Sequence, residues 1–307
     1  MEIQSKEISF VIQGAVNNTY AIKVISSIRK NFPESELILS TWNGSNINEE
    51  IRSMLDVVLE SEDPGDYTNK EDTPINVNRQ IVSTRNGISK TTREYIVKTR
   101  TDIVFENSNI LYELSRNYSR NKLFSISNEF ILASDFSTRS HLKGLKVPFW
   151  ICDFIYAGKR DDIKKLFSLK NYPIDFFSEY EKGHPKTYQD KRHIYKYTPE
   201  SYISYEYLDS KKTIKFEHSY DNNLEALRYY HNYLINNFVI LNKRQLGVSS
   251  LKYYLPFSSR NYMFTNTDWR ISRKEFKFFS KDTFYELIEF IEWIYIKLAK
   301  KRFKSND

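Results

Sequence analysis

An alternation of short apolar runs with segments of helical spacing limits the folds open to this chain more than any other feature. Runs at 8–12 (ISFVI), 36–42 (ELILSTW) and 56–60 (DVVLE) are separated by segments in which apolar residues recur with helical periodicity. Continuous apolar runs of this length are typical of strands buried on both faces of a parallel sheet. The first half of the chain therefore predicts an α/β fold with a mostly parallel sheet.

A fourth run, 95–105 (YIVKTRTDIVF), carries charged residues at its centre, where Lys98, Arg100 and Asp102 interrupt apolar neighbours. Burial of an isolated charge is costly, so such residues are normally paired, exposed at a strand end, or bound to a ligand. In open α/β sheets, ligands bind outside the carboxyl ends of the strands. This run therefore indicates a strand that reaches a ligand, with its charges directed at that ligand.

Polar residues also follow the other predicted strands, and a helix predicted from Val77 adds more. Because the carboxyl ends of parallel strands meet at one edge, we expect these residues to converge on one crevice. Gly14 allows the backbone to approach a ligand closely, and Arg79 and Ser83 share a helix face. The alternative interpretation is that they are ordinary polar strand ends and a solvated helix face. The candidates are Gln13, Gly14, Thr41, Trp42, Asp63, Arg79, Ser83, Arg100 and Asp102.

The cysteine content and the charge exclude several classes of protein. Cys152 is the single cysteine, which excludes an intramolecular disulfide and a cysteine-based zinc site; its apolar neighbours predict an inert core residue. We find no signal peptide and no apolar run of about 18 residues, which predicts a cytoplasmic protein. The net charge of +7 indicates an anionic partner, such as a phosphorylated molecule, a nucleic acid or a lipid surface.

The second half of the chain is more irregular. Its pattern predicts strands over 123–134 and 148–158, helices over 160–169, from Pro199 and over 224–238, and a loop over 172–197.

Five runs in the first half, taken in order, resemble the WavE family of bacterial lipopolysaccharide and capsule biosynthesis. They are VIQGAV, SIRKNFPESELILSTWNG, LESEDPG, NVNRQIVSTRNGI and YIVKTRTD, and looser similarity continues through DFIYAG, PESYI, YLINNFVIL and TNTDW. The resemblance implies a glycosyltransferase with a GT-A-like, Rossmann-type fold. It implies a catalytic domain over 1–240, with a donor half at about 1–110 and an acceptor half at about 111–240, followed by a helical extension over 241–307.

The same resemblance implies a nucleotide-sugar donor and a carbohydrate or lipid-linked glycan acceptor. Many relatives carry two carboxylates as Asp-x-Asp, which hold a divalent ion against the donor diphosphate, whereas this chain has Arg100-Thr101-Asp102. Asp102 alone could anchor Mg or Mn, because the phosphates supply further oxygen ligands. Arg100 could instead contact phosphate directly through its planar fork. The alternative for Asp102 is a structural ion pair with a neighbouring cation.

An inverting transfer requires a carboxylate that takes the proton of the acceptor hydroxyl. The two candidates are Asp153, which lies among apolar residues, and Glu200, which follows Pro199. A buried structural acid is the alternative for Asp153, and a helix first-turn acid is the alternative for Glu200.

The C-terminal run DTFYELIEFIEWIYIKLAKKRFK predicts a helix from Asp282, apolar over much of its surface and basic at its end. Three settings fit this pattern: packing on the domain, a dimer interface, or peripheral contact with the anionic inner-membrane surface.

Two other classes of function remain open from the sequence. One is a catalytically silent relative that binds a glycan or nucleotide sugar, because the first acid of the pair is missing. The other is a nucleic-acid-binding protein, suggested by the charge and the aromatic content. We expect no nucleic acid, because cations outside the C-terminal end alternate with acids.

Overall fold

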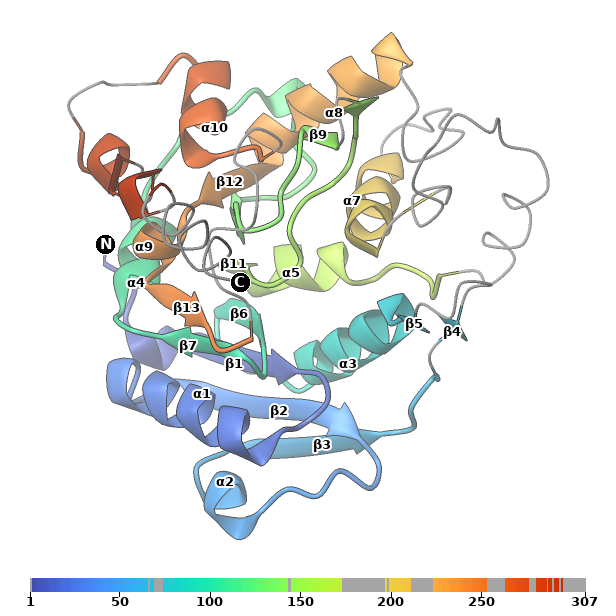
Figure 1. Cartoon of the computed structure of the whole chain (residues 1–307), viewed down its shortest axis with the longest axis vertical. Helices are drawn as coiled ribbons and strands as arrows, with labels where there is room; N and C mark the ends of the chain where they lie inside the picture. Colours follow the sequence, from blue (N-terminus) through green and yellow to red (C-terminus); the bar gives the residue numbers. More distant parts are fainter. Residues whose placement is uncertain are drawn as a thin grey trace, which may run out of the picture.

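The computed structural model describes residues 2–65, 67–68, 74–142, 145–172, 197, 199–210, 223–252 and 263–275, and 280–285, 287–288, 290–292 and 294 near the C-terminus. A seven-stranded sheet crosses this part of the molecule, with helices packed on both faces (Figure 1). In sheet order the strands are β12 (Phe238–Leu241), β8 (Ile131–Ser134), β11 (Tyr156–Lys159), β6 (Tyr95–Arg100), β1 (Ile8–Gln13), β2 (Glu36–Trp42) and β3 (Val57–Ser61).

Six of these strands run in one direction, and β11 runs in the opposite direction. β1 pairs in parallel with β2 and β6, β2 with β3, and β12 with β8. β11 is antiparallel to both β6 and β8. The predicted α/β class with a mostly parallel sheet is therefore confirmed.

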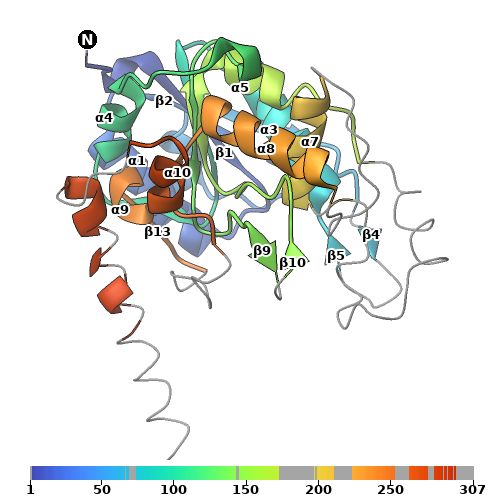
Figure 2. The same ribbon diagram turned by 90° about the horizontal axis from the view of Figure 1, so that it is seen from above.

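Different helices cover the two faces of the sheet (Figure 2). α1 (Asn18–Asn31) and α4 (Asn109–Ser115) lie on one face, and α3 (Val77–Ser89) and α5 (Arg160–Leu166) lie on the other. The remaining helices are α2 (Glu49–Ser53), α7 (Pro199–Asp209), α8 (Leu224–Asn237), α9 (Lys243–Leu246) and α10 (Asn266–Ser272), with 3-10 turns η1 (Ser5–Glu7) and η2 (Lys122–Phe124).

Short strand pairs complete the described structure. β7 (Ile103–Phe105) pairs with β13 (Val248–Ser250), β4 (Tyr67–Thr68) with β5 (Pro74–Ile75), and β9 (His141–Leu142) with β10 (Leu145–Lys146). The Leu251 amide donates to the Asp102 carbonyl at 2.9 Å, so the β7–β13 pair ties a late segment to the end of β6.

Helix starts follow local side-chain chemistry. The Asn17 side chain accepts from the Tyr20 amide at the start of α1, and the Asn223 side chain accepts from two amides at the start of α8. Such caps satisfy backbone donors that have no partner inside the helix. The predicted helices from Pro199 and over 224–238 are confirmed as α7 and α8.

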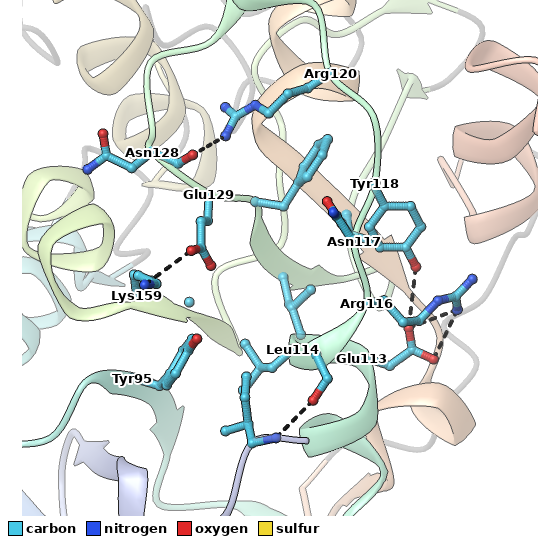
Figure 3. Close-up of a pocket in the computed structure, with 16 residues that line it drawn as sticks. Tyr95, Glu113, Leu114, Arg116, Asn117, Tyr118, Arg120, Asn128, Glu129 and Lys159 are labelled. Carbon is cyan, nitrogen blue, oxygen red and sulfur yellow. Dashed lines mark hydrogen bonds and ion pairs between the residues drawn. The ribbon is translucent and has the colours of Figure 1, made fainter. Parts of the chain in front are cut away.

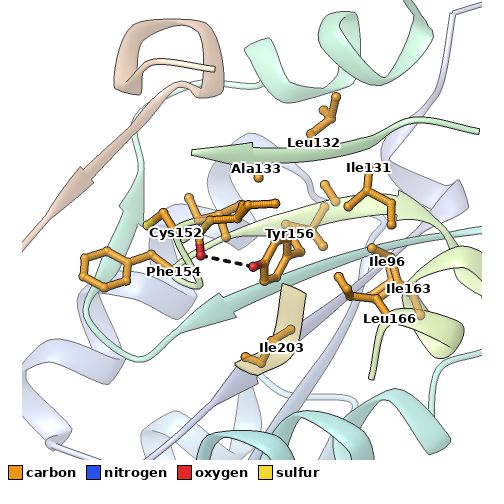
Figure 4. Packing of buried hydrophobic residues seen from close by; sticks show 14 of the residues in the cluster. Ile96, Ile131, Leu132, Ala133, Cys152, Phe154, Tyr156, Ile163, Leu166 and Ile203 are labelled. Carbon is orange, nitrogen blue, oxygen red and sulfur yellow. Dashed lines mark hydrogen bonds between the residues drawn. The ribbon is translucent and has the colours of Figure 1, made fainter. Parts of the chain in front are cut away.

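The core continues through the second half of the sheet, around the fully buried Tyr156 (Figure 4). Side chains of β6, β8, β11, α5 and α7 meet there, including Ile96, Ile131, Ile163 and Ile203. Cys152 is buried in the same cluster, and burial raises the pKa of its thiol to about 11. That pKa is consistent with the predicted inert core role.

Two predictions of long strands were wrong. Within 123–134 only Ile131–Ser134 is a strand, and within 148–158 the strand begins at Tyr156. Residues 147–155 are buried without regular structure, and their backbone bonds both to loop backbone and to side chains. The Val147 amide donates to the Ser140 carbonyl at 3.1 Å, and Thr138 accepts from the Cys152 amide at 2.9 Å. The apolar composition of this segment indicates that it is buried, but a buried segment need not be a strand.

α3 continues through Gly87 to Ser89, although glycine disfavours a helix interior. A Cβ at Gly87 would lie 2.5 Å from the Val11 Cγ1 atom and 3.0 Å from the Ser40 Cβ atom. Gly87 therefore allows α3 to approach the sheet closely.

The predicted loop over 172–197 lies outside the described residues, apart from its two ends. The predicted C-terminal helix is described in part, and its described positions from 281 to 294 are helical. Among the described helices, none has the length and apolar character needed to cross a membrane. The proposed boundary at residue 240 stays a prediction.

Candidate functional site

The order of the strands changes direction at β1. The chain continues from β1 to β2 on one side, whereas β6 lies on the other side of β1. Such a point leaves a crevice outside the carboxyl ends of the strands, where ligands of open α/β sheets bind. The residues at the ends of β1, β2 and β6 are therefore at the position expected for a site.

Strand register brings the predicted residues of these strands to one edge. Gln13 of β1 pairs with Ser40 of β2 and with Arg100 of β6. Thr41 and Trp42 end β2, and both are buried. The Thr41 hydroxyl lies 3.0 Å from the Ser45 hydroxyl, which ties the strand end to its turn.

Gly14 adopts a conformation that favours glycine, with φ of 115°, immediately after β1. A Cβ at this position would meet nothing within 4 Å, so there is open space beside the backbone. The Gly14 amide is bonded to the Ser40 carbonyl at 3.1 Å. Gly14 therefore leaves space for a ligand beside the backbone, whereas its amide is already bonded to Ser40.

Ser83 faces the sheet rather than solvent. Its hydroxyl lies 2.8 Å from Gln13 Oε1, to which it donates, and both residues are buried. α3 thus fixes the Gln13 side chain at the edge of β1. The interpretation of Ser83 as part of a solvated helix face was wrong.

Asp63 and Arg79 form an ion pair between the end of β3 and the first turn of α3. Arg79 Nη2 lies 2.6 Å from Asp63 Oδ2, and Arg79 Nε lies 2.8 Å from Asp63 Oδ1. The hydrogen bond from Arg79 lowers the pKa of the Asp63 carboxyl. Both side chains are about one-third exposed, so the pair is within reach of a ligand.

Arg100 and Asp102 form a second pair, with two parallel hydrogen bonds. Arg100 Nε donates to Asp102 Oδ1 at 2.9 Å, and Arg100 Nη2 donates to Asp102 Oδ2 at 2.8 Å. The Arg100 guanidinium also lies 4.3 Å from the centre of the Phe154 ring. Pairing explains how the charges of this strand are tolerated, because Asp102 is only 5% exposed.

This pairing does not fit a resident divalent ion. Both Asp102 oxygens are engaged by Arg100, and no group of three or more His, Cys, Asp or Glu side chains that could hold a metal ion occurs among the described residues. An ion at Asp102 would require Arg100 to turn away first. Metal dependence at Asp102 stays a prediction.

Lys98 and Asp153 form the most deeply buried charged part of this edge. Lys98 is fully buried, and its ammonium donates to the main-chain carbonyl of Asp153. Burial lowers the pKa of Lys98 to about 8, and the Asp153 charge opposes that effect. Lys98 faces the same side of the sheet as Arg100, since alternate strand residues share a face.

One oxygen of the Asp153 carboxylate is held by a hydrogen bond, and the other is buried without a partner among the described residues. Gln80 of α3 donates to Asp153 Oδ2, whereas Asp153 Oδ1 is buried with no hydrogen-bond partner among the described residues. A buried acceptor without a partner is costly, so such atoms often mark a place for a ligand or a proton. Asp153 is 7% exposed.

From the sequence, Lys98 had no role beyond its place in the charged run, and Gln80 was only a residue of the predicted helix from Val77, with a face towards the donor and a solvated face both open. The period-two pattern that places Lys98 on the face of Arg100 could have identified it. Nothing in the sequence could have identified Asp153 as the partner of Gln80, because the two residues are 73 positions apart.

Glu200 lies in the first turn of α7 and is half-buried. The charges of Asp153 and Glu200 both contribute to raising the pKa of the Tyr156 hydroxyl, although burial is the largest cause. The two carboxylate candidates therefore act on the same tyrosine.

A cavity of about 310 Å³ lies at the opposite, amino-terminal edge of the sheet, and no predicted site residue lines it (Figure 3). Its charged side chains are engaged with each other: Arg116 lies 3.0 Å from Glu113, and Lys159 lies 3.2 Å from Glu129. We therefore assign the candidate site to the carboxyl edge, where a buried carboxylate oxygen is open.

The fold and this edge together define an α/β protein with its candidate ligand site at the switch point of a mostly parallel sheet. Residues 8–304 match the family described as WavE lipopolysaccharide synthesis. Because the match covers nearly the whole chain, the chain belongs to this family, which supports a role in the synthesis of surface polysaccharide.

Comparison with curated proteins finds no match. Among solved structures, the crystal structure of S. aureus TarS is similar over 77% of this chain and 35% of the TarS chain, with 9% sequence identity and a TM-score of 0.39. The chain thus matches about a third of that neighbour's length.

Proposed function

We propose that this protein is a glycosyltransferase that moves a sugar from a nucleotide-activated donor to a lipopolysaccharide or capsule acceptor. The observation that carries the proposal is the open, buried oxygen of Asp153 beside Lys98 and Arg100 at the switch point of the sheet. Family membership over residues 8–304 supports the class of acceptor.

The donor diphosphate binds at the ends of β1 and β6. Its phosphates are anionic, and the cations nearest this edge are Arg100 and Arg79. A guanidinium fork can contact a phosphate in the same two-bond manner in which Arg100 now contacts Asp102. The open space beside Gly14 leaves room for the nucleoside, with Gln13, Thr41 and Trp42 around it.

Asp153 acts as the general base. The acceptor hydroxyl oxygen attacks the anomeric carbon of the donor, and its proton passes to Asp153 Oδ1. The bond from that carbon to the diphosphate oxygen breaks, and its electron pair leaves on the nucleotide. Gln80 and Lys98 act as positioning residues, because one holds the second carboxylate oxygen and the other holds the Asp153 carbonyl.

Negative charge on the departing diphosphate is stabilised by preorganised cations. Arg100 supplies this charge when a phosphate replaces Asp102 as its partner. A divalent ion, if bound, would supply the same stabilisation, but no step here depends on one.

One specific observation favours a catalytically silent relative as the second candidate. Arg100 stands where many relatives have the first acid, and it neutralises Asp102. Such a protein would bind a nucleotide sugar and transfer nothing. We propose the enzyme because Asp153 has an open oxygen in a position that a purely binding site would not need.

The test is transfer by Asp153→Asn, which keeps the size of the side chain and removes its basicity. In a strain that lacks the gene, the wild type should restore the native lipopolysaccharide or capsule, and Asp153→Asn should not. Asp161→Asn is the matched control, because Asp161 is an exposed acid of α5. Loss of about 100-fold or more in turnover of the purified variant is expected for a general base.

Full restoration by Asp153→Asn would contradict the assignment of the base. A wild type that binds a nucleotide sugar but never restores the polysaccharide would establish the silent relative instead. Product analysis by NMR should show an inverted anomeric centre, and a retained centre would remove Asp153 from this role.

A further inference from the structure

The helical segment at 281–294 is attached to the molecule through polar contacts. Asp282 is paired with Arg270 and lies 3.5 Å from Arg116, and Gln245 donates to Asp282 at 2.9 Å. Further along the segment, Glu292 is paired with Lys243 at 2.8 Å and with Arg244. This segment lies at the outer edge of the molecule beside α9, in red in Figures 1 and 2.

The side chains on the inner face match those contacts. Tyr285 and Glu292 line a cavity together with Lys243 and Arg244 of α9, and Tyr285, Ile288 and Glu292 are all partly buried. They are three and four positions apart and therefore share one face of a helix. Among the described residues of this segment, ion pairs from Asp282 and Glu292 join it to the rest of the protein.

The opposite face is apolar and exposed. Phe284 is 59% exposed, Leu287 53%, Ile291 57% and Ile294 38%, and their spacing of three, four and three places them on one stripe. A surface helix of a globular protein normally has the reverse arrangement, with its apolar stripe against the core. A continuous exposed apolar stripe marks a surface that binds a partner.

The charge beside the stripe favours an anionic lipid surface over a second copy of this chain as its partner. The chain has a net charge of +7, and the sequence just beyond the stripe is basic, with Lys297, Lys300, Lys301, Arg302 and Lys304. Pairing two such stripes in parallel would bring these cations together and oppose association. An anionic lipid surface would attract them.

We propose that the stripe of Phe284, Leu287, Ile291 and Ile294 docks this protein on an anionic lipid surface. The helix lies in the plane of the interface, with its apolar side chains at the acyl boundary and the basic residues among the anionic headgroups. The ion pairs to Arg270, Lys243 and Arg244 hold the helix so that its apolar face points away from the domain. This contact is separate from sugar transfer and does not depend on the proposed enzyme activity.

The test is flotation of the full chain with vesicles of phosphatidylcholine alone, and of phosphatidylcholine mixed with an equal amount of phosphatidylglycerol. We expect the protein to float with the mixed vesicles, to bind neutral vesicles far more weakly, and to dissociate as salt is raised. Leu287→Ser/Ile291→Ser should weaken binding to the mixed vesicles by about tenfold or more.

Leu123→Ser/Leu224→Ser is the matched control. Those two leucines are 76% and 64% exposed but lie outside the 281–294 segment, so this variant should float as the wild type does. Thermal unfolding of each variant establishes that it is folded, since all four positions are exposed.

Three results would overturn the proposal. The wild type could fail to float with the anionic vesicles, or the helix variant could float as well as the control variant. Sedimentation could also show a wild-type dimer that the helix variant alone dissociates while vesicle binding is unchanged, which would assign the stripe to a second copy.

Discussion

Lys98→Met should change how the stability of this protein depends on pH. Lys98 is fully buried, and burial lowers its pKa from 10.5 to about 8. Since one pKa unit corresponds to about 1.4 kcal/mol, the charged lysine costs the folded state about 3 kcal/mol. Methionine keeps the length of the side chain and removes the titrating group.

The direction follows from the two pKa values. Below about pH 8 the lysine is charged in both the folded and the unfolded state, so its cost is present in full. Between about pH 8 and 10.5 the folded state loses the proton first, so the free energy of unfolding rises with pH. The free energy of unfolding of the wild type minus that of the variant should therefore increase by about 3 kcal/mol over this range.

Urea unfolding from neutral pH to about pH 10.5 measures this difference. The buried tyrosines also titrate at high pH, but they are present in both proteins and cancel in the difference. At neutral pH the two proteins should be closer in stability, because the variant leaves the Asp153 carbonyl without the donor that offsets part of the cost.

Lys159→Met is the matched control. Hydrogen bonds from Lys159 to Glu94 and Glu129 raise the pKa of that lysine, which is the opposite direction. Its difference from wild type should stay flat up to about pH 10.5 and fall above it. A flat difference for Lys98→Met would refute the reasoning that a charged lysine is held in the core.

Other substitutions test single contacts. Gly87→Ala should lower the free energy of unfolding by about 1 kcal/mol, because its Cβ would approach the Val11 Cγ1 atom to 2.5 Å, and a gain in stability would show that α3 can move away. Arg79→Ala should cost less than about 1 kcal/mol of stability, since the pair is partly exposed, yet should weaken nucleotide binding, and unchanged affinity would return Arg79 to a structural role. Cys152 should react with iodoacetamide only as fast as the protein unfolds, because the thiol is buried and its pKa is raised to about 11; rapid labelling of the folded protein would contradict that burial.

The sequence predicts the first half of the fold well, because strands buried on both faces show as continuous apolar runs. It predicts the second half less well. Residues 147–155 are as apolar as a strand, but their backbone bonds to loop backbone and to side chains such as Thr138, and periodicity does not indicate such contacts. The antiparallel β11 between β6 and β8 follows from pairing across the chain, which no local pattern specifies.

The same limit applies to the candidate site. Strand ends such as Gln13 and Arg100 can be placed by the rule that parallel strands end at one edge. The partners of Lys98 and Asp153 cannot, because each contact joins residues more than fifty positions apart. A charged residue in a buried strand indicates that it has a partner, but only the folded structure shows which residue that partner is.

The central claim is that the ends of β1 and β6 hold a nucleotide donor. The most direct measurement is thermal stabilisation by UDP, GDP, CDP and CMP, each with and without Mn, on the wild type and on Arg100→Gln/Asp102→Asn. The double variant removes both charges together and leaves no unpaired ion. We predict that one nucleotide stabilises the wild type and that the variant loses most of that stabilisation. No stabilisation by any of the four, or equal stabilisation of the variant, would contradict the account.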